Sequence, residues 1–183
     1  MTSIGNSRDR YGVVAILLHW TMALLVIGLA VLGLYMVTLP DAGFNTKKVT
    51  LVIYHKELGL LALVLVAARL AWRVTQVLPE LVADLPDWQK LAARFVHLSF
   101  YALLIALPVS GSLMSSAAGI PVSFLGLFRL HDFVHRDTDL FQQLIMVHKV
   151  LGYLLIVSIF VHAGAALKHH FVSRDDTLRR ILP

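Results

Sequence analysis

The sequence contains no cysteine among its 183 residues. That absence excludes disulfide bonds, iron–sulfur clusters with thiolate ligands and covalently attached c-type haem, all of which need cysteine sulfur. Charge is scarce as well, because Asp, Glu, Lys and Arg make up 15% of the chain against 58% hydrophobic residues. One soluble domain of this length could not bury so much apolar surface, so the composition indicates a membrane protein surrounded by lipid.

Four apolar runs are long enough to cross a bilayer, which requires about 20 residues each. They lie at about residues 11–39, 49–72, 91–115 and 141–169. The sequence therefore predicts an all-α fold, with residues 1–183 forming a single domain built as an integral membrane four-helix transmembrane bundle.

The basic residues predict an orientation rather than a nucleic-acid partner. The net charge is +5, but the cations lie at the ends of apolar runs, so we expect no nucleic acid. Four spans put both termini on one side of the membrane. Ten of the sixteen Lys and Arg residues flank that side: Arg8, Arg10, Arg69, Arg73, Lys90, Arg94, Lys168, Arg174, Arg179 and Arg180. By the positive-inside rule, both termini are expected to face the cytoplasm.

Histidines inside the spans are the strongest functional signal in the sequence. Polar side chains within a bilayer are costly and are usually functional. His148 and His162 are separated by fourteen residues, so both imidazoles point within about 40° of one direction and lie roughly 21 Å apart. This offset suits two metal centres, one near each membrane face, and is too large for one.

Each centre needs a second ligand at a matching depth. His55 provides it on the outer side, where the five residues from His55 (HKELG) read like the five from His148 (HKVLG). On the inner side, depth alone leaves His19 and His97 as alternatives. Because an iron held between two imidazoles has no open position, such centres pass single electrons and do not bind dioxygen.

Further motifs along the chain carry a family resemblance. They are Arg10-Tyr11-Gly12, His19-Trp20, the motif at His55, His97 with Ile105-Ala106-Leu107-Pro108, His148 with His162, Ala165-Ala166-Leu167-Lys168-His169-His170-Phe171 and Asp175-Asp176-Thr177-Leu178. On these motifs the chain resembles the bacterial cytochrome b561 family, which is similar to the cytochrome b subunits of hydrogenases and formate dehydrogenases. The resemblance covers nearly the whole chain.

The resemblance implies two haem b groups per chain in the bacterial inner membrane. It implies that His19 and His162 ligate the inner iron, and His55 and His148 the outer iron. It also implies electron exchange with membrane quinone, ubiquinone in particular. At least one branch of the family is regarded as a superoxide oxidase, which takes an electron from superoxide outside and reduces ubiquinone.

Several residues are candidate contacts of these ligands. Those near the inner boundary, as contacts of a quinone or of haem propionates, are Trp20, Arg94, His97 and His169. A protonatable histidine can hydrogen-bond a quinone carbonyl. Lys56 and Lys149, next to the outer histidines, are candidate propionate contacts, or else cations that extend to the interface.

The outer connection, residues 116–140, offers a positive field that could draw an anion such as superoxide. Its cationic and histidine side chains are Arg129, His131, His135 and Arg136. Three aspartates in the same connection (Asp132, Asp137 and Asp139) dilute that field.

The leading hypothesis is transmembrane electron transfer between a periplasmic donor, superoxide or a redox protein, and the quinone pool. If the chain is an enzyme, it is an oxidoreductase of the superoxide:ubiquinone type; no catalytic residue is predicted. One alternative is a cytochrome b anchor subunit of a larger redox complex. Another is a proton-coupled transporter with a histidine relay, which would be expected to have carboxylates deep in the membrane; apart from Glu57 the spans lack them.

Overall fold

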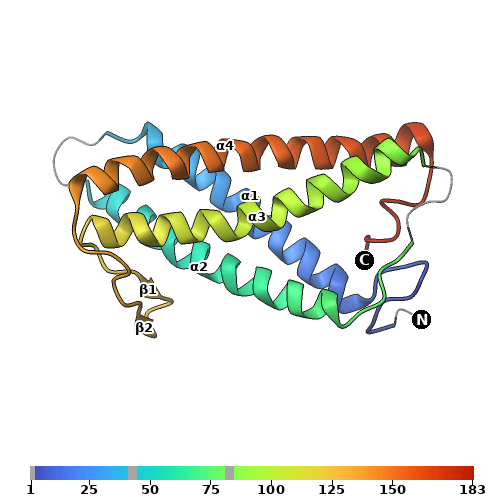
Figure 1. Ribbon diagram of the computed structural model, residues 1–183, viewed down its shortest axis with the longest axis horizontal. Helices are drawn as coiled ribbons and strands as arrows, with labels where there is room; N and C mark the ends of the chain where they lie inside the picture. The colour runs from blue at the N-terminus through green and yellow to red at the C-terminus, as the bar shows by residue number, and fades with distance from the viewer. Residues whose placement is uncertain (1–2, 41–44, 81–84) are drawn as a thin grey trace.

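Four long helices form the body of the protein in a computed structural model that describes residues 3–40, 45–80 and 85–183. They are α1 (Val13–Thr38), α2 (Thr46–Val74), α3 (Asp87–Ala117) and α4 (Thr138–Lys168). Successive helices run in opposite directions, and α1 packs on α2, α2 on α3 and α3 on α4 (Figure 1). The predicted four-helix bundle is confirmed.

The two ends of the bundle differ in structure. Both termini lie at one end, which we call the terminal end (Figure 1). The opposite end carries the connection from α3 to α4, where strands β1 (Ser123–Phe124) and β2 (Phe128–Arg129) pair antiparallel. We call it the hairpin end.

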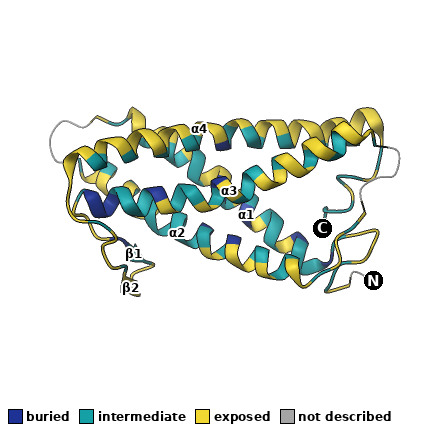
Figure 2. Cartoon of the chain, in the orientation of Figure 1, coloured by how far each residue is buried: buried dark blue, intermediate teal, exposed yellow. Residues whose placement is uncertain are grey.

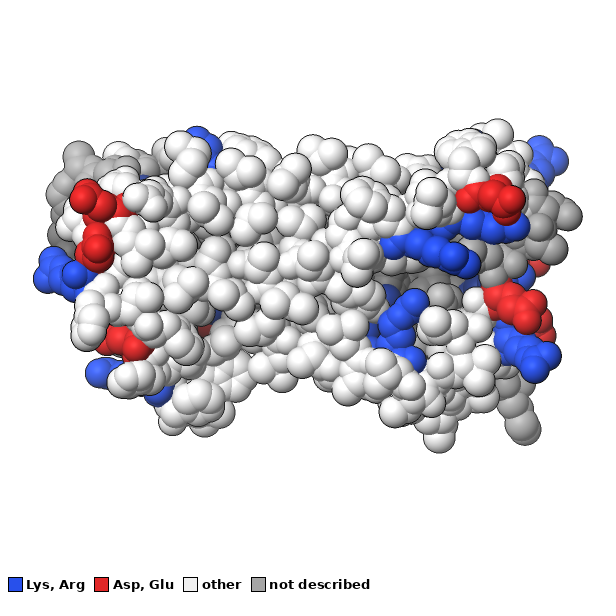
Figure 3. Space-filling model, in the orientation of Figure 1, with Lys and Arg blue, Asp and Glu red and all other residues white. Residues whose placement is uncertain are grey.

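The helix exteriors have the character of membrane spans. All four helices are long and apolar enough to cross a bilayer. Exposed residues line their outer faces (Figure 2), and many of these are large and hydrophobic. Lys, Arg, Asp and Glu gather at the two ends and leave a broad uncharged band between them (Figure 3). Such an apolar exterior is stable only when lipid covers it.

Helix caps explain why α2 and α4 begin ahead of the apolar runs that predicted them. The side chain of Asn45 accepts a hydrogen bond from a backbone N–H in the first turn of α2. The carboxylate of Asp137 accepts two such bonds in α4, from the backbone nitrogens of Asp139 and Leu140, at 2.9 and 3.0 Å. Capping groups satisfy N–H groups that have no partner within the helix, so a helix begins at its cap rather than at its first apolar residue.

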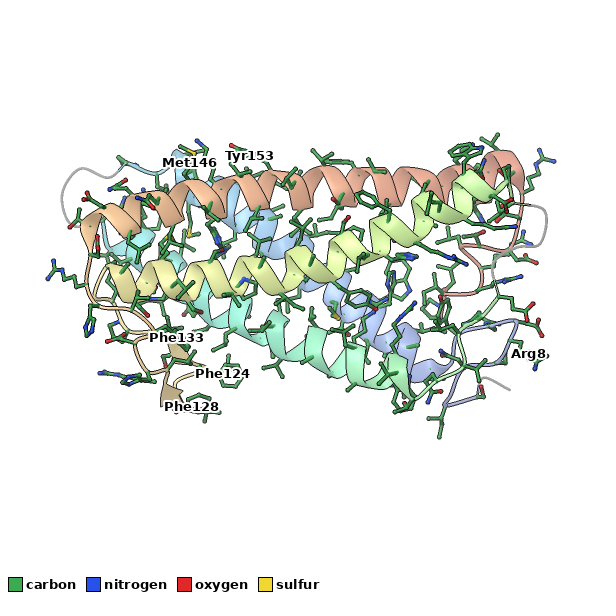
Figure 4. All side chains as sticks on the ribbon, in the orientation of Figure 1. Arg8, Phe124, Phe128, Phe133, Met146 and Tyr153 are labelled. Atoms are coloured by element: carbon green, nitrogen blue, oxygen red, sulfur yellow. The ribbon has the colours of Figure 1, made fainter. Side chains whose placement is uncertain are left out.

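The hairpin was not predicted from the sequence. Its three-residue turn contains Leu125 and Gly126, with φ angles of 50° and 71°, and glycine adopts such positive values without steric cost. The hairpin and the chain that follows it carry Phe124, Phe128 and Phe133 on the side of the bundle (Figure 4). Phe128 and Phe133 are exposed.

The C-terminal segment folds back across the terminal end. The π-helical turn η1 (His169–Ser173) follows α4, and the imidazole Nδ1 of His169 lies 2.6 Å from a carboxylate oxygen of Asp175. Burial alone would raise the pKa of Asp175, but hydrogen bonds from Thr177 and His169 outweigh it and lower that pKa. The guanidinium of Arg10 donates to the carbonyl of Leu182, which ties the tail to the N-terminal segment.

Replacing the α4 cap should weaken the bundle measurably. We expect Asp137→Ala to lower the free energy of unfolding by about 1 kcal/mol, because two N–H groups lose their acceptor. Thermal unfolding of the detergent-solubilised protein, followed by circular dichroism, measures the change. Asp132→Ala, an exposed carboxylate in the same connection, is the matched control, and an equal loss in both variants would contradict the capping role.

Candidate metal centres

Histidines from separate helices face each other at two levels of the bundle. Towards the terminal end, the ring centroids of His19 in α1 and His162 in α4 lie 6.3 Å apart. Towards the hairpin end, the centroids of His55 in α2 and His148 in α4 also lie 6.3 Å apart. The structure thus brings together both histidine pairs that the family resemblance implies.

The distance within each pair fits one metal ion between two imidazoles. A ligating nitrogen lies about 2.0 Å from its metal and about 1.1 Å from its own ring centre, so opposed imidazoles have centroids about 6.2 Å apart. Both observed distances, 6.3 Å, agree with this value. Each pair therefore fits the two axial positions of one haem iron.

A buried serine lies within hydrogen-bond distance of His148. Ser110 donates its hydroxyl proton to the carbonyl of Leu107 at 2.9 Å, and its oxygen lies 2.9 Å from Nδ1 of His148. The hydroxyl oxygen therefore accepts a hydrogen bond from Nδ1–H, which leaves the lone pair on Nε2. That tautomer is the one in which Nε2 can bind a metal, and an outer partner of this kind also fixes the ring orientation.

Two glycines allow the rings at the hairpin end to lie against neighbouring helices. A Cβ atom at Gly33 would lie 3.5 Å from Cε1 of His55, and one at Gly111 would lie 3.3 Å from Cε1 of His148. The second distance is tighter than ordinary van der Waals contact. Nδ1 of His55 is buried and has no hydrogen-bond partner among the described residues, as at a position where a further group completes the site.

Each helix contributes one residue to each level, and the two residues from one helix are fourteen positions apart in the sequence. The terminal level consists of His19, Arg69, His97 and His162. The hairpin level consists of Gly33, His55, Gly111 and His148. Fourteen residues make nearly four helical turns, so the two residues that each helix contributes lie on the same face of that helix, roughly 21 Å apart.

An apolar layer separates the two levels. Val26, Leu103 and Leu155, from α1, α3 and α4, are buried against one another. Val26 lies midway in sequence between His19 and Gly33 on α1, and Leu155 lies midway between His148 and His162 on α4. Apolar side chains therefore lie between the two polar levels.

His97 lies at the level of His162, although His97 itself is exposed. Counting from Arg94 places it near the membrane boundary, but α3 begins earlier, at Asp87, so His97 lies well inside the helix. Its ring centroid is 5.6 Å from that of His162, shorter than the separation of about 6.2 Å expected for imidazoles on opposite sides of one metal. The distance from His162 therefore favours His19 as the second ligand.

Two of the three other candidates at the terminal end bond to the C-terminal segment, and Arg94 does not. The indole N–H of Trp20 donates to the carbonyl of Ile181 at 2.8 Å, and His169 binds Asp175. Both side chains thus hold the C-terminal segment over the end of the bundle. Arg94 is exposed, and its guanidinium makes no hydrogen bond to the described residues.

The two lysines beside the hairpin-end histidines differ from each other. The Nζ atom of Lys56 donates to the carbonyl of Pro121 at 3.0 Å, which ties α2 to the connection before the hairpin. Lys149 is exposed and makes no hydrogen bond within the described part of the chain. Contact of either lysine with a propionate therefore stays a prediction.

Four residues of these levels were not among the predicted site residues. They are Gly33, Arg69, Ser110 and Gly111. The fourteen-residue spacing seen in α4 is a signal that finds three of them, because it leads from His19, His55 and His97 to Gly33, Arg69 and Gly111. Ser110 carries no such signal, since its role depends on the packing of α3 against α4.

Comparison with known proteins identifies the family. Residues 10–183 match the family model described as prokaryotic cytochrome b561. The chain belongs to this family. Cytochrome b561 proteins are membrane electron-transfer proteins and the family implies haem b, so the resemblance noted from the sequence is confirmed.

Curated relatives extend over nearly the same length. Cytochrome b561 homolog 2 of Escherichia coli (strain K12) is 36% identical over 98% of this chain and 95% of its own length. Cytochrome b561 homolog 1 of the same organism is 34% identical over 70% of this chain and 73% of its own. A protein named probable superoxide oxidase CybB, from Yersinia pestis, is 28% identical over 95% and 96%.

A side chain at Gly111 should displace His148. We expect Gly111→Val to lower the haem content of the purified protein, because the added methyl groups would enter the space of the His148 ring. The pyridine haemochrome assay measures haem per chain. Gly28→Val adds the same side chain at an exposed helical site with no atom within 4 Å of the new Cβ; equal haem loss there would argue against the close contact.

Proposed function

We propose that this chain carries two haem b groups and exchanges single electrons between a donor on the hairpin side and the ubiquinone pool of the membrane. The observation that carries the proposal is the recurrence of one geometry, two opposed imidazoles 6.3 Å apart, at two levels of the bundle. His19 and His162 would hold one iron, and His55 and His148 the other.

Haem b supplies a one-electron carrier at each level. The chain supplies the rest. Two imidazoles would occupy both axial positions, which leaves no place for dioxygen and restricts each centre to electron transfer. Ser110 holds His148 in the ligating tautomer, and Gly33 and Gly111 let the hairpin-end rings approach the neighbouring backbones.

The apolar layer between the levels has a separate role in this proposal. The side chains of Val26, Leu103 and Leu155 are apolar and offer no hydrogen-bonding group to a water chain. Electrons can tunnel across such a layer, but protons cannot follow them through it. The two membrane faces would therefore exchange electrons and stay separate for protons.

The proposed orientation places the terminal end in the cytoplasm and the hairpin end in the periplasm of a bacterium. The majority of the Lys and Arg residues flank the terminal end, as the positive-inside rule requires of a cytoplasmic face. The donor would then meet the connection between α3 and α4. Its cationic and histidine side chains are exposed at the hairpin end: Arg129, His131, His135 and Arg136.

Superoxide is the candidate donor with the most support. One relative bears the name probable superoxide oxidase, and an anion would be attracted by the exposed cations of the connection. Asp132, Asp137 and Asp139 lie in or beside the same connection and weaken that field. In this proposal the reaction is a one-electron oxidation of superoxide to dioxygen, with ubiquinone as the final acceptor.

Loss of one hairpin-end ligand should remove one haem and leave the other. We expect the reduced, solubilised protein to show low-spin b-type bands with about two haems per chain, and His55→Ala and His148→Ala each to retain about half. Absorption spectra and the pyridine haemochrome assay measure both quantities.

His131→Ala, an exposed histidine of the outer connection, is the control and should keep both haems. A colourless wild-type protein would contradict the proposal and favour a transporter. Full haem content in both hairpin-end variants would show that the pairing is wrong.

A further inference from the structure

The two halves of the bundle carry the same pattern with one departure. Helices α1 and α3 both have a histidine at the terminal level and a glycine at the hairpin level. Helices α2 and α4 both have a histidine at the hairpin level. At the terminal level they differ, because α2 presents Arg69 where α4 presents His162.

Contacts within each half follow the same correspondence. In the first half, both terminal guanidinium nitrogens of Arg69 lie 3.2 Å from Nδ1 of His19. In the second half, His162 lies against His97, with ring centroids 5.6 Å apart. The guanidinium therefore takes the place of an imidazole, and it brings a permanent positive charge into the terminal level.

No such charge acts on the hairpin level among the described residues. His148 is bonded there to the neutral hydroxyl of Ser110, and Nδ1 of His55 has no hydrogen-bond partner. Of the two lysines that directly follow these histidines, Lys56 directs its ammonium to the carbonyl of Pro121, and Lys149 is exposed. Arg69, by contrast, interacts electrostatically with His19, His97 and His162.

We propose that Arg69 makes the terminal-level centre the more easily reduced of the two and so favours electron movement from the hairpin level to the terminal level. This inference rests on the proposed function. Reduction removes one unit of positive charge from a centre, so a nearby fixed cation stabilises the reduced form relative to the oxidised form. Arg69 is thus a positioning and electrostatic residue, not a ligand.

The hydrogen bond between Arg69 and His19 changes when His19 binds a metal through Nε2. A guanidinium can only donate, so its contact with Nδ1 requires a lone pair there, whereas the ligating tautomer carries a proton on Nδ1. Arg69 must then turn from Nδ1. It lines a cavity of about 30 Å³ with Arg73, Trp72 and Tyr101, and the indole nitrogen of Trp72 has no partner among the described residues.

The charge stays at the terminal level in either position, because α2 fixes the backbone of Arg69 there. The space-filling view shows Lys and Arg side chains around a hollow in the surface near the terminal end (Figure 3). Arg73, one turn further along α2, lines the same cavity and interacts electrostatically with His97. Its charge should act in the same direction as that of Arg69, and more weakly.

A redox titration of single-haem protein tests the proposal. In the His55→Ala background, which should keep only the terminal-level haem, we expect Arg69→Gln to shift the reduction equilibrium towards the oxidised form by at least about tenfold. For one electron that is a fall in midpoint potential of about 59 mV. Arg69→Lys should restore most of the wild-type value, because it keeps the charge.

Controls separate charge from general damage. Arg179→Gln removes the same charge from an exposed ion pair with Asp176 at the same end and should leave the potential unchanged. In otherwise wild-type protein, Arg69→Gln should lower one midpoint potential and leave the other. If Arg69→Gln does not load haem, Arg73→Gln must show a smaller fall in the same direction.

An unchanged or raised terminal-level potential in the loaded Arg69→Gln protein would overturn the proposal, as would an unchanged one in Arg73→Gln if that variant has to be used. An equal fall in Arg179→Gln would also overturn it. These outcomes differ from failure of the proposed function, which would appear in the wild-type protein as the absence of two low-spin haems.

Discussion

A seven-residue register along α1 and α4 holds the structure together around its two sites. The residues of the terminal level, the apolar layer and the hairpin level follow at steps of seven on α1 (His19, Val26, Gly33) and on α4 (His148, Leu155, His162). Seven residues are close to two helical turns, so one line of side chains keeps facing the partner helices over the length of the bundle. Any shift of one residue would turn a histidine towards lipid.

The same register explains how polar rings are tolerated inside an apolar bundle. A buried imidazole needs a hydrogen-bond partner or a metal for its nitrogens. His148 has Ser110 on one nitrogen and His19 has Arg69, while glycines on α1 and α3 give the hairpin-end rings room. At His148 this leaves Nε2 to a ligand, whereas the contact of Arg69 with Nδ1 of His19 has to open before Nε2 of that ring can bind a metal.

Sequence reasoning predicted the features that depend on composition and on spacing within one helix. Apolar runs predicted the four spans, and the offset of His148 and His162 predicted two levels. It missed features that depend on contacts between distant segments. These are the contact of the Ser110 hydroxyl with His148, the contact of Arg69 with His19, and the hydrogen bond from Trp20 that holds the C-terminal segment. Arg69 was counted as a flanking charge because the sequence shows that it lies near the end of an apolar run. The sequence does not show that Arg69 contacts His19 on α1.

In the proposed function, the departure of Arg69 from the internal repeat would give electron transfer between the two levels a preferred direction. Two identical halves would give two levels with matching surroundings, and an electron would have no preference between them. One departure, arginine on α2 where α4 has histidine, breaks that match. In the proposed arrangement His55 and His148 would hold the iron of the hairpin level, and His19 and His162 that of the terminal level, where their rings lie 6.3 Å apart. Arg69 would then add a fixed positive charge beside the terminal-level pair alone, so the asymmetry of the two levels would come from one residue of the repeat.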